Sequence, residues 1–307
     1  MMWGFIGRRI AHSIISIIGA SILIFVVSRL SGDPAALLLP ADAPQSALIA
    51  MRKTLGLDLP MWRQYLMFAG RAITGDFGQS YSWQMPALML VLERVPATLQ
   101  LALSALLFSV LISVPLGILS AVHRGGWIDT FGKSFAMLGQ AMPGFWVGLL
   151  LILLFSVRLN WLPAFGSGGA SHLILPAIAL GWYPVAAQMR VVRSAMLDVL
   201  ESDYIRMGRS IGAPERTLIW KYAFRNAAIP LVTVLGVYFA SMLGGAFVIE
   251  VIFAWPGLGR TVVDAVFARD FPVVQAGVLF TSILFVVANL LVDLSYGLID
   301  PRIRHHD

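Results

Sequence analysis

The chain has 307 residues, of which 58% are hydrophobic and 12% are charged, with a formal net charge of +6 and a mean hydropathy of +0.81. A soluble domain of this length needs far more charge to cover its surface, so the composition excludes a water-soluble globule. The chain contains no cysteine, which excludes disulfides, thiol chemistry and cysteine-based metal sites.

Six segments without Asp, Glu, Lys or Arg are each at least 19 residues long. About 20 apolar residues are enough for a helix to cross the hydrocarbon core, so we expect six transmembrane helices. The segments cover residues 10–28, 95–122, 134–157, 159–189, 226–249 and 271–292. The next longest gap, at 77–92, has only 16 residues.

The first apolar segment follows Arg8 and Arg9, as the core of a signal peptide would. A signal-peptide core is about 7–15 residues long and ends in small residues. This run is longer and ends in "FVVSRLSGDP", without an A-x-A site. We therefore expect residues 1–30 to form an N-terminal tail and a permanent first helix.

Residues 31–96 have the character of an extracytoplasmic insert between the first two helices. The turn signals "SGDP", "GLDLP" and "TGDFGQS" alternate with amphipathic pieces such as "PQSALIAMRKTLG", which predicts a small, mostly helical cap. The remaining residues, 97–307, are expected to form a five-helix core with a cytoplasmic loop at 195–228 and an outer loop at 250–275.

Four prolines inside or near the spans are expected to kink the helices. They are Pro115, Pro143, Pro176 and Pro184. Gly144 and Gly148 in "GFWVG" form a small-xxx-small face that favours close helix approach.

A densely charged stretch, "ESDYIRMGRSIGAPERTLIWKYAFRNAAIP", covers residues 201–230. An amphipathic helix is predicted over 196–211, with Gly212 placed to end it. Pro214 and Glu215 suit the first turn of a second short helix. The predicted apolar stripe is Leu197, Leu200, Tyr204, Met207 and Ile211. Two interpretations remain open: a protein-docking surface or a hairpin in the lipid headgroups.

The distribution of Lys and Arg predicts the orientation of the chain. Placing the N-terminus inside puts 13 of the 22 basic residues on the cytoplasmic side, which is the side such residues favour. Both termini and the 195–228 loop are then cytoplasmic, whereas the insert and the 250–275 loop lie outside.

The expected spans contain no Asp or Glu, although ion-driven carriers usually place an ionisable residue at membrane depth. "TFGKS" at 130–134 resembles the end of a phosphate loop, but Trp127 stands where that motif requires a glycine. We therefore expect no enzyme activity, catalytic residue or nucleotide site in this chain. His305 and His306 are expected to form a solvated tail and not a metal site. Energy for active transport would have to come from a partner.

The 201–230 stretch resembles the coupling loop of membrane subunits of ATP-binding-cassette importers, with Gly212 at the glycine of that motif. Arg206, Met207 and Gly208 replace its Glu-Ala-Ala. "DYIRMGRSIG" and "FRNAAIP" are similar to the dipeptide, oligopeptide and nickel-type branch. So are "SGDPA", "LGLDLPMWRQY", "GDFGQS", "FSVRLNWLPAFG", "FAWPGLGRTVVDAVFARDFPVVQ" and "DPRIR". The resemblance covers nearly the whole chain, in order.

The resemblance implies an all-α, type I permease with six transmembrane helices in the lipid bilayer of a bacterial inner (cytoplasmic) membrane. It implies a second homologous permease, two ABC ATPases that hold ATP and Mg, and a periplasmic or extracellular solute-binding protein. No cofactor in this chain and no nucleic acid are implied. The cargo would be di- or oligopeptides, with nickel chelate or glutathione as alternatives. A passive channel or membrane scaffold is the alternative from another class.

The resemblance also suggests site residues. The ATPases would clamp the cytoplasmic loop at Asp203, Tyr204, Arg206, Arg209, Gly212, Ala213, Pro214 and Glu215. The solute-binding protein would contact the outer loop at Trp255, Gly257, Arg260, Asp264, Arg269 and Asp270; interfacial anchoring and solvation are the alternatives there. Polar or small groups in the spans are candidates for the transport path, with helix packing as the alternative for each: Gln140, Gly144, Gln188 and Asn289.

Overall fold

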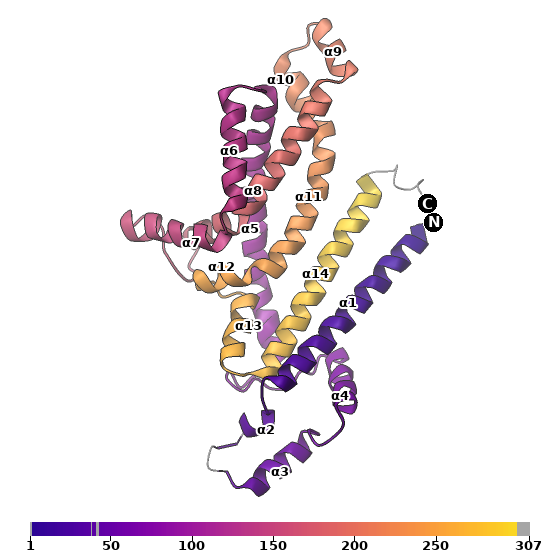
Figure 1. Ribbon diagram of the computed structural model, residues 1–307, viewed down its shortest axis with the longest axis vertical. Coiled ribbons are helices and arrows are strands. Elements are labelled where there is room, and N and C mark those ends of the chain that lie inside the picture. The colour runs from indigo at the N-terminus through magenta and orange to yellow at the C-terminus, as the bar shows by residue number, and fades with distance from the viewer. Residues whose placement is uncertain (1, 38, 41–42, 300–307) are drawn as a thin grey trace. The chain divides into compact units, whose positions relative to one another are not determined.

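The computed structural model describes residues 2–37, 39–40 and 43–299. These residues form helices and connecting turns, with one isolated bridge between Gln79 and Pro86 (Figure 1). Five helices are long and apolar enough to cross a membrane, and a bent pair makes up to six. The prediction of an all-α membrane protein is therefore confirmed. The five are Gly7–Leu30, Ala87–Val122, Ala170–Leu200, Glu215–Gly245 and Phe271–Val292.

The chain divides into two compact units. The first unit comprises Met1–Thr98 and Pro256–Val287, and the second comprises Leu99–Trp255 and Ala288–Asp307. Helices α5 (Ala87–Val122) and α14 (Phe271–Ile299) contribute to both.

The first unit begins with α1 and carries the insert helices. Besides parts of α5 and α14, it contains α1 (Met2–Leu30), α2 (Pro34–Leu37), α3 (Gln45–Thr54), α4 (Met61–Ile73) and α13 (Leu258–Phe267). Leu90, Val262 and Val273 belong to its buried core. Gly277 is required there, because a Cβ atom at this position would lie 2.3 Å from Val262 Cγ2.

Aromatic packing holds α4 of the insert against α1. The Phe25 ring lies 5.6 Å from the Tyr65 ring and 5.7 Å from the Phe68 ring, measured between centroids. The hydroxyls of Ser21 and Tyr65 are hydrogen-bonded at 2.8 Å. The described part of the insert is helical in α2, α3 and α4, as its amphipathic pieces predict, and α5 already begins at Ala87.

The second unit contains the helices that follow α5. They are α6 (Trp127–Ala141), α7 (Gly144–Leu151), η1 (Ile152–Arg158), α8 (Ala170–Leu200), α9 (Asp203–Ser210), α10 (Glu215–Thr217), η2 (Leu218–Ala223), α11 (Phe224–Gly245) and α12 (Phe247–Ile252). The elements named η are π-helical.

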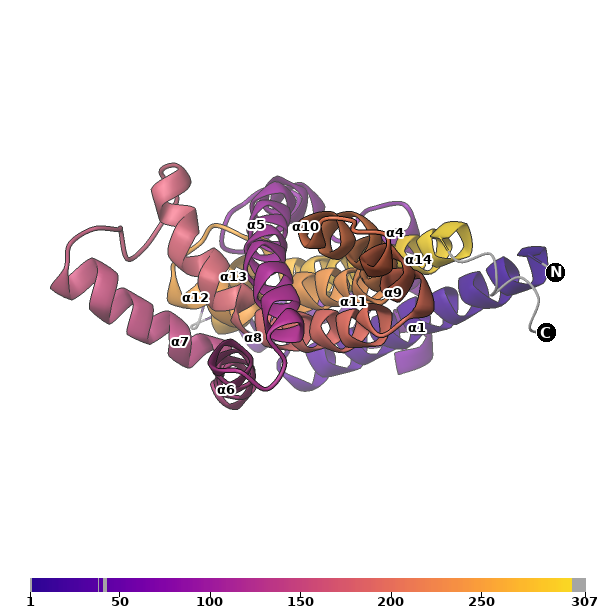
Figure 2. The same cartoon turned by 90° about the horizontal axis from the view of Figure 1, so that it is seen from above.

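The third predicted span, 134–157, is broken at Pro143, where a kink was predicted. Helix α6 and the α7–η1 helix are bent by 102° relative to one another, and Figures 1 and 2 show α7 turning away from α6. Met142 is extended at the break, with φ −98° and ψ 119°. Pro143 disfavours the helical conformation of the residue before it and has no N–H to donate, so the helix ends there.

The fourth predicted span also starts later than the charge-free run. Helix α8 begins at Ala170, after an irregular stretch, and continues through Pro176 and Pro184. Gly144 and Gly148 lie at close helix contacts, as predicted. A Cβ at Gly144 would be 3.0 Å from the Ala179 carbonyl oxygen, and one at Gly148 would be 3.0 Å from the Phe253 ring.

Candidate functional site

A helical hairpin follows α8 and includes the predicted coupling residues (Figure 1). Helix α9 ends before Gly212, whose φ of +78° is the left-handed conformation that glycine adopts without strain. The prediction that Gly212 ends the helix is confirmed. Pro214 is the N-cap of α10, with φ −60° and ψ 131°, and Ala213 donates its N–H to the Gly208 carbonyl at 3.0 Å.

Two details of the predicted hairpin are wrong. The helix predicted over 196–211 is broken, because Ser202 is extended with φ −72° and ψ 153°. The second arm is not a short helix, because α10, η2 and α11 run on as one apolar segment, Glu215–Gly245. The hairpin is thus the direct extension of a membrane-spanning helix and is not a separate knob.

Buried apolar side chains hold the hairpin to the helix bundle. Ile205 and Leu218 are fully or almost fully buried, and Ile205 packs in a cluster with Ile118 and Met196. A Cβ at Gly208 would lie 2.6 Å from Leu218 Cδ2, so a larger residue there would require the Leu218 side chain to move. The base of the hairpin is therefore rigidly connected to α5 and α8.

Ion pairs and hydrogen bonds surround the hairpin turn. Arg209 Nε lies 2.8 Å from Glu215 Oε1 across the turn, and Arg206 Nη2 lies 3.2 Å from Asp203 Oδ1 within α9. Asn226 donates to the Tyr204 hydroxyl at 2.7 Å. Each of these contacts is exposed, so individually they contribute little to stability, but they order the side chains around the tip.

The outward face of α9 is apolar. Tyr204, Met207 and Ile211 have exposed fractions of 46%, 66% and 74%, whereas Ile205 on the opposite side is buried. The predicted stripe is therefore divided: Leu197 and Leu200 at the end of α8 pack against the buried cluster, whereas its other three members are exposed. We call Tyr204, Met207 and Ile211 the hairpin stripe.

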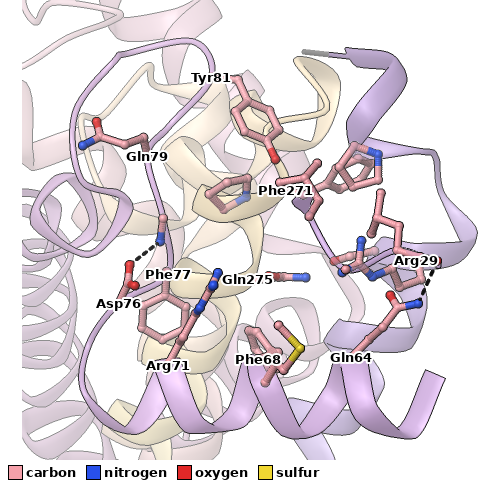
Figure 3. Close-up of a pocket in the computed structure, with 18 of the residues that line it drawn as sticks. Arg29, Gln64, Phe68, Arg71, Asp76, Phe77, Gln79, Tyr81, Phe271 and Gln275 are labelled. Atoms are coloured by element: carbon pink, nitrogen blue, oxygen red, sulfur yellow. Dashed lines mark hydrogen bonds between the residues drawn. The ribbon is translucent and has the colours of Figure 1, made fainter. Parts of the chain in front are cut away.

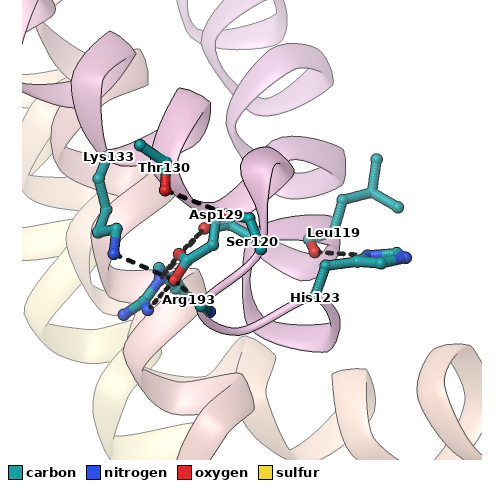
Figure 4. A network of polar contacts seen from close by, with 9 residues as sticks. Leu119, Ser120, His123, Asp129, Thr130, Lys133 and Arg193 are labelled. Carbon is teal, nitrogen blue, oxygen red and sulfur yellow. Dashed lines mark hydrogen bonds and ion pairs between the residues drawn. The ribbon is translucent and has the colours of Figure 1, made fainter.

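A buried carboxylate connects three helices of the second unit (Figure 4). Asp129 of α6 has an exposed side-chain fraction of 1% and accepts hydrogen bonds from Arg193 Nε at 2.6 Å and Arg193 Nη2 at 2.9 Å. Ser120 Oγ of α5 donates to it at 2.6 Å and the Gly125 N–H at 3.0 Å. Lys133 Nζ lies 3.2 Å away.

Sequence reasoning missed this network, although one signal was present. Asp129 is the sole acidic residue between Glu93 and Asp198, and an isolated acid among apolar helices needs a basic partner when it is buried. The sequence alone does not identify the partner, because Arg193 is 64 positions away. The same region is linked to the hairpin by Arg124, whose Nη1 lies 2.7 Å from Glu201 Oε1.

The outer loop residues separate into buried and accessible groups. Trp255, Gly257 and Asp270 are buried, so they offer little surface for the predicted direct contact with a solute-binding protein, and that contact stays a prediction. Arg260, Asp264 and Arg269 remain at the surface, with Arg260 Nε 3.6 Å from Asp264 Oδ2. Their contact with a binding protein stays a prediction.

Asp270 has a structural role. Its Oδ2 accepts hydrogen bonds from the Ser80 hydroxyl at 2.6 Å and from the Ser82 N–H at 3.0 Å. It therefore joins α13 and α14 to the loop before α5. Burial with satisfied hydrogen bonds explains why this carboxylate is not available at the surface.

Asp270→Ala is expected to lower the stability of the first unit by about 1–3 kcal/mol, because it leaves the buried Ser80 hydroxyl without its acceptor and removes the hydrogen bond from the Ser82 N–H. The measurement is the thermal unfolding midpoint of the purified chain in nanodiscs. Asp264→Ala is the matched control, since Asp264 is exposed on the same segment. Equal midpoints for the two variants would show that the Asp270 contacts do not stabilise the unit.

The candidate path residues have different surroundings. Gln188 is fully buried and accepts a hydrogen bond from Ser113 Oγ at 3.1 Å, and Gly144 lies at a helix contact. Gln140 is exposed and accepts from Arg190 Nη1 at 2.6 Å, and Asn289 is partly exposed. Whether these four residues line a transport path stays a prediction. Arg190 was assigned from the sequence only to the cytoplasmic side, and the structure adds its hydrogen bond to Gln140.

The described residues include no group of three or more His, Asp or Glu side chains that could hold a metal ion. His305 and His306 lie outside the described residues.

Comparisons with known proteins agree with this architecture. Residues 113–305 match the family model "Binding-protein-dependent transport system inner membrane component", and residues 2–102 match the corresponding N-terminal model. The chain is 38% identical over 305 residues to the glutathione transport system permease protein GsiC of Escherichia coli K12, covering 99% of this chain and 100% of the relative. The GsiC of Salmonella paratyphi A shows the same identity and coverage.

Two solved transporters share the fold. The MetNI methionine ABC transporter in an inward-facing conformation gives a TM-score of 0.56 at 18% identity, covering 69% of this chain and 97% of that chain. An amino acid ABC transporter solved with histidines gives 0.51 at 19% identity, covering 68% and 93%. The fold and the hairpin define a multi-pass inner-membrane permease. The chain belongs to the binding-protein-dependent transport system inner membrane component family, the permeases of ABC importers.

Proposed function

We propose that this chain forms half of the translocation path of an importer for glutathione or short peptides and receives mechanical work at its hairpin. Permeases of this family work with ATPases and a binding protein. The proposed assembly has a second homologous permease, two ATPases and one solute-binding protein. ATP and Mg would be held by the ATPases, and this chain would have no nucleotide site and no catalytic role.

The hairpin stripe is the observation that carries the proposal. Apolar side chains exposed on a hairpin with a packed base suit a docking surface, because a rigid surface loses little conformational entropy on binding. The rival interpretation, insertion into lipid headgroups, needs free cations. On α9, the helix that carries the stripe, Arg206 and Arg209 are instead paired with Asp203 and Glu215, which favours a protein partner for this face. Gly212, Ala213 and Pro214 shape the turn of that surface.

The proposed orientation, with the hairpin and both termini in the cytoplasm, can be tested directly because the chain has no cysteine. Ser210→Cys, at the exposed tip of the hairpin, is expected to react with a membrane-impermeant maleimide only in inverted vesicles. Ser82→Cys, in the exposed loop before α5, is expected to react only in intact cells. Labelling of Ser210→Cys in intact cells would contradict the proposed orientation.

The cargo is proposed from the relatives, two of which are glutathione permeases by name. The test is a reconstituted complex supplied with its binding protein and glutathione, a dipeptide or a nickel chelate, with ATP hydrolysis as the readout. We expect glutathione or the dipeptide to stimulate hydrolysis. If only the nickel chelate stimulates ATP hydrolysis, the cargo is a nickel chelate and not a peptide, while the role as a permease still holds.

A passive channel or scaffold predicts a different result. Such a chain would be purified without ATPases, and solute flux would not depend on ATP. Co-purification of the tagged chain with two ATPases and a second permease is the expected result.

A further inference from the structure

The first unit contains a cavity of about 500 Å³ that the proposed function does not use. Its walls come from the end of α1, from α4, from the loop before α5 and from the start of α14 (Figure 3). The volume lies within the range of small-molecule sites, which is about 300–1,000 Å³.

The charge of the cavity lining is predominantly positive. Arg29 and Arg71 both line the cavity, and Asp76 is the only acid among the described lining residues. Asp76 Oδ1 is already engaged, since it accepts the Gly78 N–H at 3.0 Å. Within the described part of the chain, the Arg71 guanidinium makes no hydrogen bond or ion pair. An arginine fork without an acceptor is suited to a carboxylate or phosphate group.

Buried polar atoms of the lining are also without partners among the described residues. They are Ser28 Oγ, Arg29 Nε and Gln64 Oε1. Ser28 and Gln64 have exposed fractions of 4% and 7%, so bulk water does not replace the missing partner. The Gln64 amide is held in place because its Nε2 donates to Leu59 O at 2.8 Å and Leu57 O at 3.2 Å. A buried polar group without a partner costs about 1–3 kcal/mol, which a ligand can recover.

Neutral hydrogen-bonding groups and rings complete the lining. Gln275 and Gln79 supply amides, and Phe68 and Phe271 supply rings (Figure 3). Burial raises the pKa of Tyr81, and the Asp270 carboxylate raises it further, so Tyr81 carries a neutral hydroxyl at physiological pH. These groups suit a ligand with an anionic end and an amide-containing body.

We propose that this cavity is an oxyanion-binding site, in which Arg29 and Arg71 hold a carboxylate or phosphate group and the amides and rings contact the rest of the ligand. Two sources provide this chemistry. One is the carboxylate of a small peptide, and this source rests on the proposed function. The other is the phosphate of an anionic lipid, because Arg29 belongs to the last turn of the α1 span.

The test uses the full chain in nanodiscs, without ATPases, so that its outcome is independent of coupling. The probes are trialanine, trialanine amide, which lacks the carboxylate, and inorganic phosphate, each titrated by calorimetry in phosphatidylcholine discs. A parallel preparation contains phosphatidylglycerol, and native mass spectrometry counts the lipid retained. The variants are Arg71→Gln, Arg29→Gln and Gln275→Glu. Gln275→Glu preserves size and adds a repelling charge. Arg63→Gln is the matched control, because Arg63 lies on α4 outside the cavity and stacks on Trp62.

We expect trialanine to bind at least about tenfold more tightly than its amide, with that preference lost in Arg71→Gln and Gln275→Glu but kept in Arg63→Gln; tenfold is ~1.4 kcal/mol. If the wild-type chain retains one phosphatidylglycerol, Arg71→Gln does not retain it, and trialanine does not bind, then the ligand is the phosphate of an anionic lipid. Oxyanion binding that is unchanged in Arg71→Gln and Gln275→Glu, or no binding of any probe, overturns the proposal. Arg29 is partly buried, so its replacement can also affect folding. The binding result for Arg29→Gln is therefore used only if its thermal unfolding midpoint matches that of Arg63→Gln.

Discussion

Gly212→Trp is expected to lower solute-stimulated ATP hydrolysis and uptake by the reconstituted complex at least about tenfold, a loss of ~1.4 kcal/mol or more of coupling. No atom lies within 4 Å of a Cβ built at Gly212, and Gly212 is exposed, so a side chain can start from this position without a clash. The indole would enlarge the turn directly after Ile211 of the hairpin stripe, where the ATPase is proposed to dock. The measurement is hydrolysis with and without the solute-loaded binding protein.

Backbone strain must be separated from this steric effect. Gly212 has φ +78°, and a side chain in that conformation costs roughly 1–2 kcal/mol. Gly212→Ala introduces the strain without the bulk. Gly166→Trp is the matched control, because Gly166 has φ +85° and no atom within 4 Å of a built Cβ but lies in the loop before α8. We expect both controls to remain coupled. Wild-type hydrolysis and uptake by a folded Gly212→Trp would refute the coupling role.

Asp129→Asn is expected to destabilise the second unit by about 3 kcal/mol, since it leaves Arg193 beside a neutral group in a largely buried position. The substitution also weakens the contacts that join Ser120 of α5 and Lys133 of α6 to the same carboxylate. Loss of helicity with temperature, measured in nanodiscs, is the readout. We expect the midpoint to fall clearly below that of the wild type.

Two further variants show whether the pairing itself is responsible. Asp198→Asn removes an exposed acid from α8, the helix that carries Arg193, and is expected to change the midpoint little. The double variant Asp129→Asn with Arg193→Gln removes both charges and is expected to be more stable than Asp129→Asn alone, because no unpaired charge remains. A double variant that is additive would show that the ion pair is not the cause.

The sequence predicted the helical class and most span positions because those depend on local composition. A charge-free run of about 20 residues can satisfy the bilayer only as a helix, whatever it packs against. The ending of a helix at Gly212 is equally local, since it depends on the glycine backbone. Pro143 was expected to kink its span, but the size of the bend, 102°, depends on the packing of α7 against α8 and α12.

The site was predicted in part. The positions of the hairpin residues followed from a linear motif, and their spacing identified an apolar stripe. Which face of α9 is packed did not follow, because Ile205 is buried in a cluster that includes Ile118 of α5, which is distant in the sequence. Amphipathic spacing identifies a stripe but not the surface that covers it. For the same reason, nothing in the local sequence separates the buried Asp270 from the exposed Asp264.

Composition and local pattern by themselves determined that this protein is an all-helical membrane protein with a glycine-ended hairpin, since the bilayer and the backbone impose those features on short segments. Only the tertiary structure decided the pairing of Asp129 with Arg193, the outward direction of the hairpin stripe and the burial of Trp255 and Asp270. These depend on groups brought together from positions far apart in the chain, where contact depends on how the helices pack.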